Sequence, residues 1–395
     1  MNSKEKLLLI TAIAPIPKDS GGAVRMYNTI KCLSDKYDIY LIYFTKDNIN
    51  NKDDENFYNK YTKHSYPILI NPEKDKKSFI VNFQPYWFSD WYNEEVKILI
   101  SNLIKKEKIN KVQIEFTQLL YLIKTIPDSV NAFFTAHDIS SISFYRRLKE
   151  EKDFKKIIVY FIRLIEIYFY EKKYLQKFDV VYSVSKNDKH QLEKMYNLKK
   201  VINIDNGIEE VNFLKTINKN NNQINLGLIG SFNHPPNKFS FDYFLNEIAP
   251  LLEKEMINYK FYLAGKNDSE EVKNLIQKSK IKNKHKIIDL GFVNESKDFF
   301  KKIDILVTPI FSGSGSRIKI LEALGFGKKI ISSPIGAEGI DLKTNLISIA
   351  NTPDDYIKEI KYYSLNKDKI NFDEEKKNIN KLTWKYIFKN CIYDN

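Results

Sequence analysis

The sequence predicts an α/β protein of two domains, each a parallel sheet with helices on both faces. The chain has 395 residues, which is more than one ordinary hydrophobic core organises. Short apolar runs alternate with segments of helical spacing along the whole chain, which is typical of βαβ units and therefore of parallel strands. A polar stretch rich in Asn and Lys, residues 215–223, interrupts the alternation and marks a linker.

The first half opens with a βαβ unit. Residues 6–14 form a near-continuous apolar run, as expected of a strand that is covered on both faces. The loop after this strand contains Gly21 and Gly22 but lacks the G-x-G-x-x-G fingerprint of dinucleotide sites. The expected strands of this half are 6–14, 38–44, 111–115, 132–136, 180–185 and 201–204, and the expected helices are 23–34, 95–107, 154–175 and 187–195.

The alternation restarts after the linker. The expected strands are 225–229, 259–264, 286–289, 303–308 and 329–332, and the expected helices are 239–252, 270–279, 296–302, one from Ser316 and one near Pro353. We therefore expect an N-terminal domain over residues 1–212 and a second domain over residues 213–375. Two such sandwiches in tandem would place a cleft between two sets of strand ends.

The chain is basic, with 63 Lys and Arg against 50 Asp and Glu and a net charge of +13. Binding of nucleic acid, an anionic membrane surface and a lysine-rich proteome are three explanations. The Asn-, Lys- and Ile-heavy composition favours the third for much of the charge, and a phosphate-bearing ligand or a membrane surface could account for the rest. Cys32 and Cys391 lack metal-site spacing, which indicates reduced cysteines in a cytosolic protein.

Two hydrophobic segments allow more than one interpretation. Residues 79–92 are dense in aromatic side chains, which either pack on a sheet edge or form an acceptor or membrane surface. Residues 155–174 are aromatic and aliphatic but carry charges, so they form either a buried helix or an interfacial one. No apolar run approaches the ~18 residues that span a bilayer, and no signal peptide is expected.

Residues 310–327 read as a strand end, a Gly/Ser loop and a helix start. Free backbone N–H groups and the helix dipole make such a turn an anion site. Arg317 and Lys319 lie in the first turn, where the dipole disfavours cations, and a bound anion would resolve that conflict. Glu322 follows in a mostly apolar run, where we expect a buried carboxylate that a ligand must satisfy.

Three further loops follow strands of the second domain, and a His follows a strand of the first. Their backbone and side chains suit a nucleotide diphosphate: glycines allow close approach, polar groups donate to phosphate, and backbone beside Phe292 could pair with a base. The candidate ligands are Gly230, Ser231, Asn237, Lys238, Gly265, Phe292 and Val293, with Ser314, Gly315 and Ser316 in the Gly/Ser loop. In the first domain, Gly22 and His137 lie where open α/β sheets place ligands.

These landmarks together resemble glycosyltransferase family 4, the retaining nucleotide-sugar transferases with a GT-B fold. Residues 313–339 look like the signature of that family, and 229–237, 290–293, 205–208 and the Gly-Gly-x-x-Arg loop at 21–25 match other landmarks in order. The resemblance implies two Rossmann-like αβα domains facing a central cleft. It also implies that a C-terminal helix, about 376–395, packs back on the first domain.

The resemblance implies roles for individual residues. Glu322 would hold the ribose hydroxyls, and His137 would contact the donor sugar near the reacting carbon. The sugar-contacting carboxylate of the family falls at Ser314, and its diphosphate cations fall at Ser231 and Pro236. Arg317, with Lys319 or Lys238, is then the replacement for those cations. His137, Arg317 and Glu322 are the expected catalytic residues.

The expected function is transfer of a sugar, with retention, from a nucleotide diphosphate donor to a glycan or lipid-linked acceptor in surface polysaccharide or glycolipid synthesis. The nucleotide sugar is a co-substrate, and no metal or other cofactor is obligatory, because the cations and helix N-terminus stabilise the leaving diphosphate. A cytoplasmic location, with contact to the inner membrane face as a further alternative, fits these substrates. The alternatives are a nucleotide-sugar epimerase and a basic nucleic-acid-binding protein. Scattered lysines argue against nucleic acid as a partner.

Overall fold

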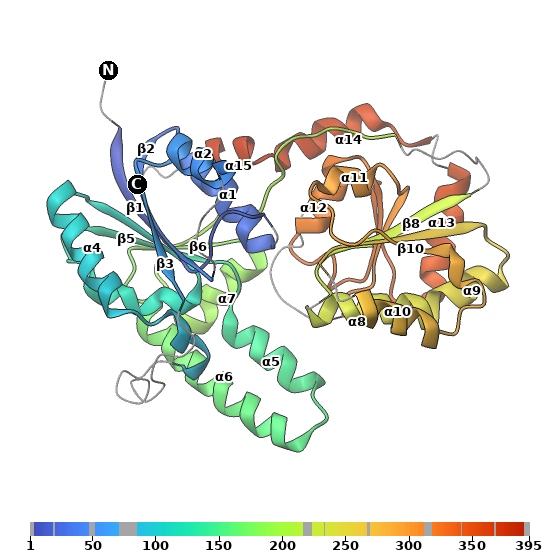
Figure 1. The fold of residues 1–395 in the computed structure, drawn as a ribbon, viewed down its shortest axis with the longest axis horizontal. Coiled ribbons are helices and arrows are strands. Elements are labelled where there is room, and N and C mark those ends of the chain that lie inside the picture. Colours follow the sequence, from blue (N-terminus) through green and yellow to red (C-terminus); the bar gives the residue numbers. More distant parts are fainter. Residues whose placement is uncertain are drawn as a thin grey trace. The chain divides into compact units, whose positions relative to one another are not determined.

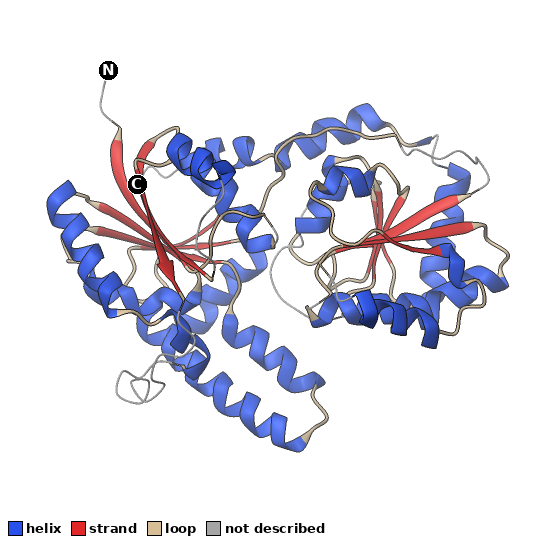
Figure 2. Ribbon diagram, in the orientation of Figure 1, coloured by secondary structure: helices blue, strands red, loops and turns tan. Residues whose placement is uncertain are grey.

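The computed structural model of the chain describes residues 4–18, 20–46, 52–70, 85–215, 223–232, 234–266, 269–311, 318–340, 342–366 and 369–390. The contacts divide it into two compact units, Met1–Asn206 and Gly207–Asn390. Each unit is a parallel sheet with helices on both faces (Figure 1, Figure 2). The predicted α/β class with two parallel sheets is confirmed.

The first unit contains a seven-stranded sheet in the order β3-β2-β1-β4-β5-β6-β7. Its strands are β1 (Glu5–Thr11), β2 (Tyr37–Thr45), β3 (His64–Leu69), β4 (Lys111–Glu115), β5 (Asn131–Ala136), β6 (Val180–Ser183) and β7 (Val201–Asn203). Its helices are α1 (Gly21–Leu33), α2 (Lys52–Tyr61), α4 (Glu94–Glu107), α5 (Ser140–Glu150), α6 (Phe154–Leu175) and α7 (Lys186–Tyr196), with 3₁₀ segments η1 (Tyr86–Trp91) and η2 (Thr117–Thr125). The central strands are apolar on both faces because helices cover both.

The second unit contains a six-stranded sheet in the order β10-β9-β8-β11-β12-β13. Its strands are β8 (Ile224–Ile229), β9 (Tyr259–Ala264), β10 (Ile287–Asp289), β11 (Ile305–Thr308), β12 (Lys329–Ser332) and β13 (Ile347–Ile349). Its helices are α8 (Pro235–Tyr243), α9 (Ala249–Lys254), α10 (Ser269–Lys278), α11 (Ser296–Phe300), α12 (Ile318–Gly325), α13 (Pro353–Asn366), α14 (Phe372–Ile379) and α15 (Trp384–Asn390). Both sheets reverse their strand order beside the first strand of the unit, and ligands bind at such switch points.

The elements of the first unit that were absent from the sequence prediction include β3 and α5. β3 lies at the sheet edge and contains Pro67, whose missing N–H is tolerated only where no neighbour needs it. α5 has no side-chain N-cap of its own. Glu171 of α6 instead accepts from the backbone N–H groups of Ser140 (2.9 Å) and Ser141 (3.2 Å). A tertiary contact therefore supplies the cap, which the local sequence does not reveal.

The helix predicted over residues 239–252 is interrupted. A π-helical turn, η3 (Phe244–Ile248), separates α8 from α9. Pro250, in the first turn of α9, has no N–H to continue the α-helical ladder, which favours a wider turn before it. β13 was also absent from the sequence prediction.

The structure describes most of the two hydrophobic segments, residues 79–92 and 155–174, for which the sequence allowed more than one interpretation. In η1, Phe88 is buried in the first core and Trp91 Nε1 donates to Ala12 O at 2.8 Å, so this part packs on the sheet as the first interpretation predicted. Residues 79–84 lie outside the described residues. The helix expected over 155–174 is buried only in its C-terminal half, so the prediction of a buried helix is wrong for its N-terminal half. Among the described residues, no helix is long and apolar enough to cross a membrane.

The contacts place the division between the units at Asn206 and Gly207, earlier than the predicted boundary at 212/213. Residues 208–214 pack on the C-terminal end of α12, where Asn212 N donates to Gly325 O at 2.8 Å. α14 and α15 group with the second unit, in which Trp384 N donates to Ile208 O at 2.9 Å. The return of the C-terminal helix to the first domain remains a prediction.

Candidate functional site

In the first unit, a carboxylate and an imidazole meet at the carboxyl edge of the sheet. Glu115 ends β4, and His137 follows the neighbouring strand β5. His137 Nε2 lies 2.6 Å from Glu115 Oε2. The Glu115 side chain is 1% exposed and that of His137 10%. Parallel pairing of β4 with β5 forces this proximity, because it brings the carboxyl ends of both strands to one edge.

The Glu115 carboxylate is held from its other side. Gln113 Nε2 donates to Oε1 at 2.5 Å and Thr135 Oγ1 donates to the same oxygen at 3.0 Å. A fixed carboxylate opposite Nε2 favours the tautomer that carries hydrogen on that nitrogen and sets the orientation of the ring. Burial lowers the pKa of His137, while the hydrogen bond to Glu115 raises it, and burial prevails. His137 is therefore a neutral imidazole near pH 7.

Phe116 fixes the plane of the His137 ring. The two rings stack with centroids 3.6 Å apart and an interplanar angle of 12°. Phe116 has a φ of +74°, a left-handed conformation that costs a non-glycine residue about 1–3 kcal/mol. Gly22 lies against the same ring, since a Cβ there would be 3.1 Å from Phe116 Cζ. Gly22, Phe116 and His137 thus form one cluster, and a Cβ at position 22 would require Ile13 or Phe116 to shift.

Arg25 has a structural role in this unit. Its side chain is buried and donates to Asn206 Oδ1 at 2.6 Å and to Ile204 O at 3.0 Å. The guanidinium therefore fixes the loop after β7. Its charge also contributes to lowering the pKa of His137.

In the second unit, the loops after β8 and β9 touch through their glycines. Gly230 and Gly265 have φ values of +147° and +141°. A Cβ on Gly265 would lie 2.0 Å from Gly230 O, so no other residue fits there without moving the loop. Gly265 N also donates to Gly291 O at 2.8 Å, which extends the contact to the loop after β10. Three adjacent strand ends are thereby fixed relative to one another.

Asn237, Lys319 and Ser231 converge beside Gly230. Lys319 Nζ donates to Asn237 Oδ1 at 2.5 Å, and Asn237 Nδ2 donates to Ser231 O at 2.7 Å. A Cβ on Gly230 would lie 3.0 Å from Lys319 Nζ. Lys319 is in the first turn of α12, so an ammonium group and a helix N-terminus adjoin one glycine loop. Such a constellation suits a phosphate.

Glu322 lies one turn beyond Lys319 on the same face of α12. It is half-buried and not fully buried, which corrects the expectation from its apolar neighbours. Ser296 Oγ, at the start of α11, donates to Glu322 Oε1 at 3.3 Å. A carboxylate that is only half-buried at this position can be reached by the hydroxyls of a ligand, for which it is a suitable acceptor.

Several predicted ligands lie elsewhere or outside the described residues. Lys238 forms an ion pair with Glu271 of α10 and does not join the cluster around Lys319. Phe292 is 57% exposed, and Val293 packs against the second unit's core. Ser314, Gly315, Ser316 and Arg317 lie outside the described residues.

Glu115 and Phe116 are site residues that the sequence prediction missed. The signal for Glu115 was a carboxylate in the last position of a buried strand, where a charge needs a partner. Phe116 carried no signal, because its unusual φ is visible only in three dimensions. Among the residues that the structure describes, no group of His, Cys, Asp and Glu side chains could hold a metal ion.

Comparison with known proteins identifies the family. Residues 223–364, all within the second unit, match the profile of the family described as Glycosyl transferases group 1. This part of the chain is a group 1 glycosyltransferase domain. The matched range contains the Gly230 loop, Lys319 and Glu322, so the family signature covers the cluster built above.

Solved glycosyltransferase structures share the fold. Sucrose-phosphate synthase from Thermosynechococcus elongatus matches with a TM-score of 0.69 and 11% identity over 98% of this chain and 97% of that chain. HepE from Anabaena, solved in complex with UDP and glucose, matches with a TM-score of 0.61 and 11% identity over 98% and 95% of the two chains. At these identities the likeness shows the fold, which is GT-B.

A sequence relative spans nearly the same length. An uncharacterized 44.6 kDa protein in the cps region of Klebsiella pneumoniae is 22% identical over 379 residues, which cover 91% of each chain. The similarity to this relative therefore extends over parts of both units of the chain.

Replacing Glu115 with Gln tests the first-unit pair. Because the carboxylate raises the pKa of His137, the variant should show a lower His137 pKa than the parent. NMR titration of the histidine ring protons measures it, with the exposed His285 as internal reference. An unchanged His137 pKa would mean that Glu115 does not control the ring.

Replacing Gly265 with Ala tests the contact between the loops after β8 and β9. Overlap with Gly230 and the φ of +141° should lower the free energy of unfolding by at least about 2 kcal/mol more than Gly291→Ala does. Gly291 is the matched control, since its φ is +63° but no atom lies within 4 Å of a Cβ placed there. Chemical denaturation measures both, and equal losses would contradict the close approach.

Proposed function

We propose that this glycosyltransferase transfers a sugar from a nucleotide diphosphate donor to a glycan or lipid-linked acceptor, with retention of configuration. The observation that carries the proposal is the convergence of Lys319, Asn237 and the Gly230 loop at the start of α12, with Glu322 one turn further on. Lys319, Asn237 and the Gly230 loop suit a diphosphate, and the Glu322 carboxylate suits the hydroxyls of a ribose. A nucleotide lying along this edge of the sheet would use both.

The chemistry follows from the leaving group. Cleavage of the bond between the sugar and the β-phosphate leaves an additional negative charge on the nucleoside diphosphate. The Lys319 ammonium group lies beside Gly230, where it would stabilise that charge, and the positive end of the α12 dipole would add to the effect. Arg317, two residues before Lys319 in the sequence, is the further cation proposed for the diphosphate. This arrangement needs no obligatory metal.

His137 is proposed as the first-unit contact to the donor sugar. It is neutral, oriented by Glu115 and held flat by Phe116, so it can exchange a hydrogen bond with a sugar hydroxyl without introducing a charge. A fixed, neutral donor or acceptor costs little reorganisation when the sugar develops positive charge. Gly22 leaves the space beside Phe116 that a larger residue would fill.

Two of the comparisons support the choice of substrates. The structure of HepE contains UDP and glucose, and the Klebsiella relative lies in a cps region. We infer a nucleoside diphosphate sugar as donor and a role in surface polysaccharide synthesis at the cytoplasmic face of the membrane.

The proposal is tested by comparing Lys319→Met with Lys238→Met. Lys319 adjoins the Gly230 loop, whereas Lys238 pairs with Glu271. Lys319→Met should weaken binding of the best-bound nucleoside diphosphate among UDP, GDP, ADP and TDP at least about tenfold, because a charged hydrogen bond contributes about 1.5–3 kcal/mol. Lys238→Met should leave the affinity within about twofold.

Isothermal titration calorimetry measures these affinities, and thermal denaturation confirms that both variants fold. Full affinity in Lys319→Met would remove the phosphate assignment. Loss of affinity in Lys238→Met alone would move the site toward α10.

A further inference from the structure

The helices α5 and α6 form an antiparallel pair that extends beyond the sheet of the first unit (Figure 1). Glu171 joins them at their base, where it caps α5 and accepts from Tyr196 Oη of α7 at 2.6 Å. Burial raises the pKa of Glu171 to about 7. The base of the pair is therefore anchored in the core, and its far end has no such anchor among the described residues.

α6 exposes a continuous apolar stripe from Phe154 to Phe169. The spacing is i, i+4, i+7, i+8, i+11 and i+15, which places these side chains on one helix face. The stripe consists of Phe154 (74% exposed), Ile158 (46%), Phe161 (53%), Ile162 (51%), Ile165 (42%) and Phe169 (61%). A row of large apolar side chains in water marks a surface that binds something.

The opposite side of the same helix is also apolar, but it packs inward. Tyr160 and Leu164 pack against the first core and Ile167 belongs to it. The inward side thus attaches α6 to the core of the first unit, and the exposed stripe does not pack on that core. We therefore look for a partner outside the chain that covers the stripe.

The surroundings of the stripe are basic and aromatic. Residues 145–165 contain seven Lys and Arg against three Asp and Glu. Tyr86 (40% exposed) and Trp87 (51%) of η1 lie under the guanidinium of Arg163, at 5.7 and 4.9 Å from its Cζ to the ring centroids. Basic residues attract anionic lipid headgroups, and Trp and Tyr favour the boundary between headgroups and hydrocarbon.

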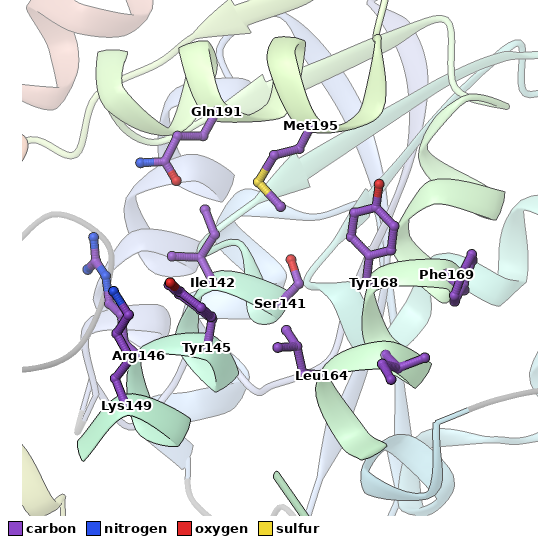
Figure 3. A pocket seen from close by; sticks show the side chains of 11 residues that line it. Ser141, Ile142, Tyr145, Arg146, Lys149, Leu164, Tyr168, Phe169, Gln191 and Met195 are labelled. Carbon is purple, nitrogen blue, oxygen red and sulfur yellow. The ribbon is translucent and has the colours of Figure 1, made fainter. Parts of the chain in front are cut away.

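A cavity of about 680 Å³ opens between α5, α6 and α7. Figure 3 shows its two ends: Arg146 and Lys149 of α5 lie on one side, and Tyr168 and Phe169 of α6 on the other. Leu164 and Met195 also line it. Ile165 and Phe169 belong both to the cavity wall and to the exposed stripe. The cavity is therefore continuous with the stripe, charged at one end and apolar at the other.

We propose that the α5–α6 pair binds an anionic membrane surface through the stripe, and that the cavity takes the hydrocarbon chain of one lipid whose phosphate lies at Arg146 and Lys149. The chemistry of the cavity matches an amphiphile: an acyl or isoprenoid chain fits between the apolar side chains, and an anionic head fits the cationic end. Each buried methylene favours such a chain, and each nearby cation favours an anionic head.

Charge argues against a second copy of this chain as the partner of the stripe. Two copies would bring their excess of basic residues together, and like charges at an interface oppose association. An anionic bilayer supplies the opposite charge and an apolar interior in one partner. The cavity begins close to His137 along the chain, because α5 follows His137 directly and Ser141, in the first turn of α5, lines the cavity wall. The proposed lipid site and the proposed sugar contact therefore both belong to the first unit.

Vesicle flotation tests the membrane contact without any donor or acceptor, so its outcome is independent of sugar transfer. The protein should bind vesicles of phosphatidylglycerol and phosphatidylcholine at least about tenfold more tightly than vesicles of phosphatidylcholine alone. The double variant Phe161→Ser and Ile165→Ser should lose most of this binding. The matched control is Met256→Ser and Leu365→Ser, which removes apolar side chains that are 90% and 82% exposed in the second unit and should bind like the parent.

Calorimetry with dodecyl phosphate tests the cavity. Leu164→Trp, which fills the cavity, should weaken binding at least about tenfold, and so should the double variant Arg146→Ala and Lys149→Ala. Inorganic phosphate should bind neither the variants nor the parent measurably, because the hydrocarbon chain of dodecyl phosphate supplies most of the affinity. Thermal denaturation of each variant reports folding.

Three results would overturn the proposal. One is equal binding of the stripe variant and the Met256/Leu365 control to anionic vesicles. Another is full dodecyl phosphate affinity in Leu164→Trp. A third is a lipid-free dimer in sedimentation velocity that the stripe variant abolishes, which would make a second copy the partner.

Discussion

The packing of Gly265 against the backbone of Gly230 is the constraint on which the second unit's site depends. The two loops follow adjacent strands, β8 and β9, and meet closely enough that a single added methyl group would displace one of them. The contact fixes Gly230, and Gly230 in turn lies beside Lys319 and Asn237. A phosphate site made from a loop backbone and a helix start needs this precision, because charged hydrogen bonds are sensitive to small displacements.

At the carboxyl edge of its sheet, the first unit carries a buried pair of side chains, Glu115 and His137. There, the buried Glu115 carboxylate is retained because Gln113 and Thr135 donate to one of its oxygens and His137 lies against the other. Burial alone would leave the imidazole neutral but free to rotate, and Glu115 together with Phe116 removes that freedom. The second unit thus carries an ammonium group beside a glycine loop, and the first unit carries an oriented neutral ring.

Much of the fold followed from the sequence because parallel strands buried on both faces leave a strong apolar signal. β4, β9, β12 and α6 begin and end at the predicted residues. The sequence did not predict α5, because its N-terminal cap is Glu171, which belongs to another helix. The pairing of Glu115 with His137 also escaped, since it depends on which strands are neighbours and not on spacing along the chain. The two lysines were indistinguishable in sequence, and only the position of Glu271 separates Lys238 from Lys319.

The fate of an isotopically labelled donor tests the central claim most directly. The glycosyltransferase is incubated with a nucleotide sugar labelled in its sugar ring and with membranes from the source cells, and the products are separated and analysed by NMR. The expected result is release of one nucleoside diphosphate for each labelled sugar that becomes linked to an acceptor, with the anomeric configuration of the donor retained. Label that remains in a nucleotide sugar with an altered ring configuration would contradict it and indicate an epimerase.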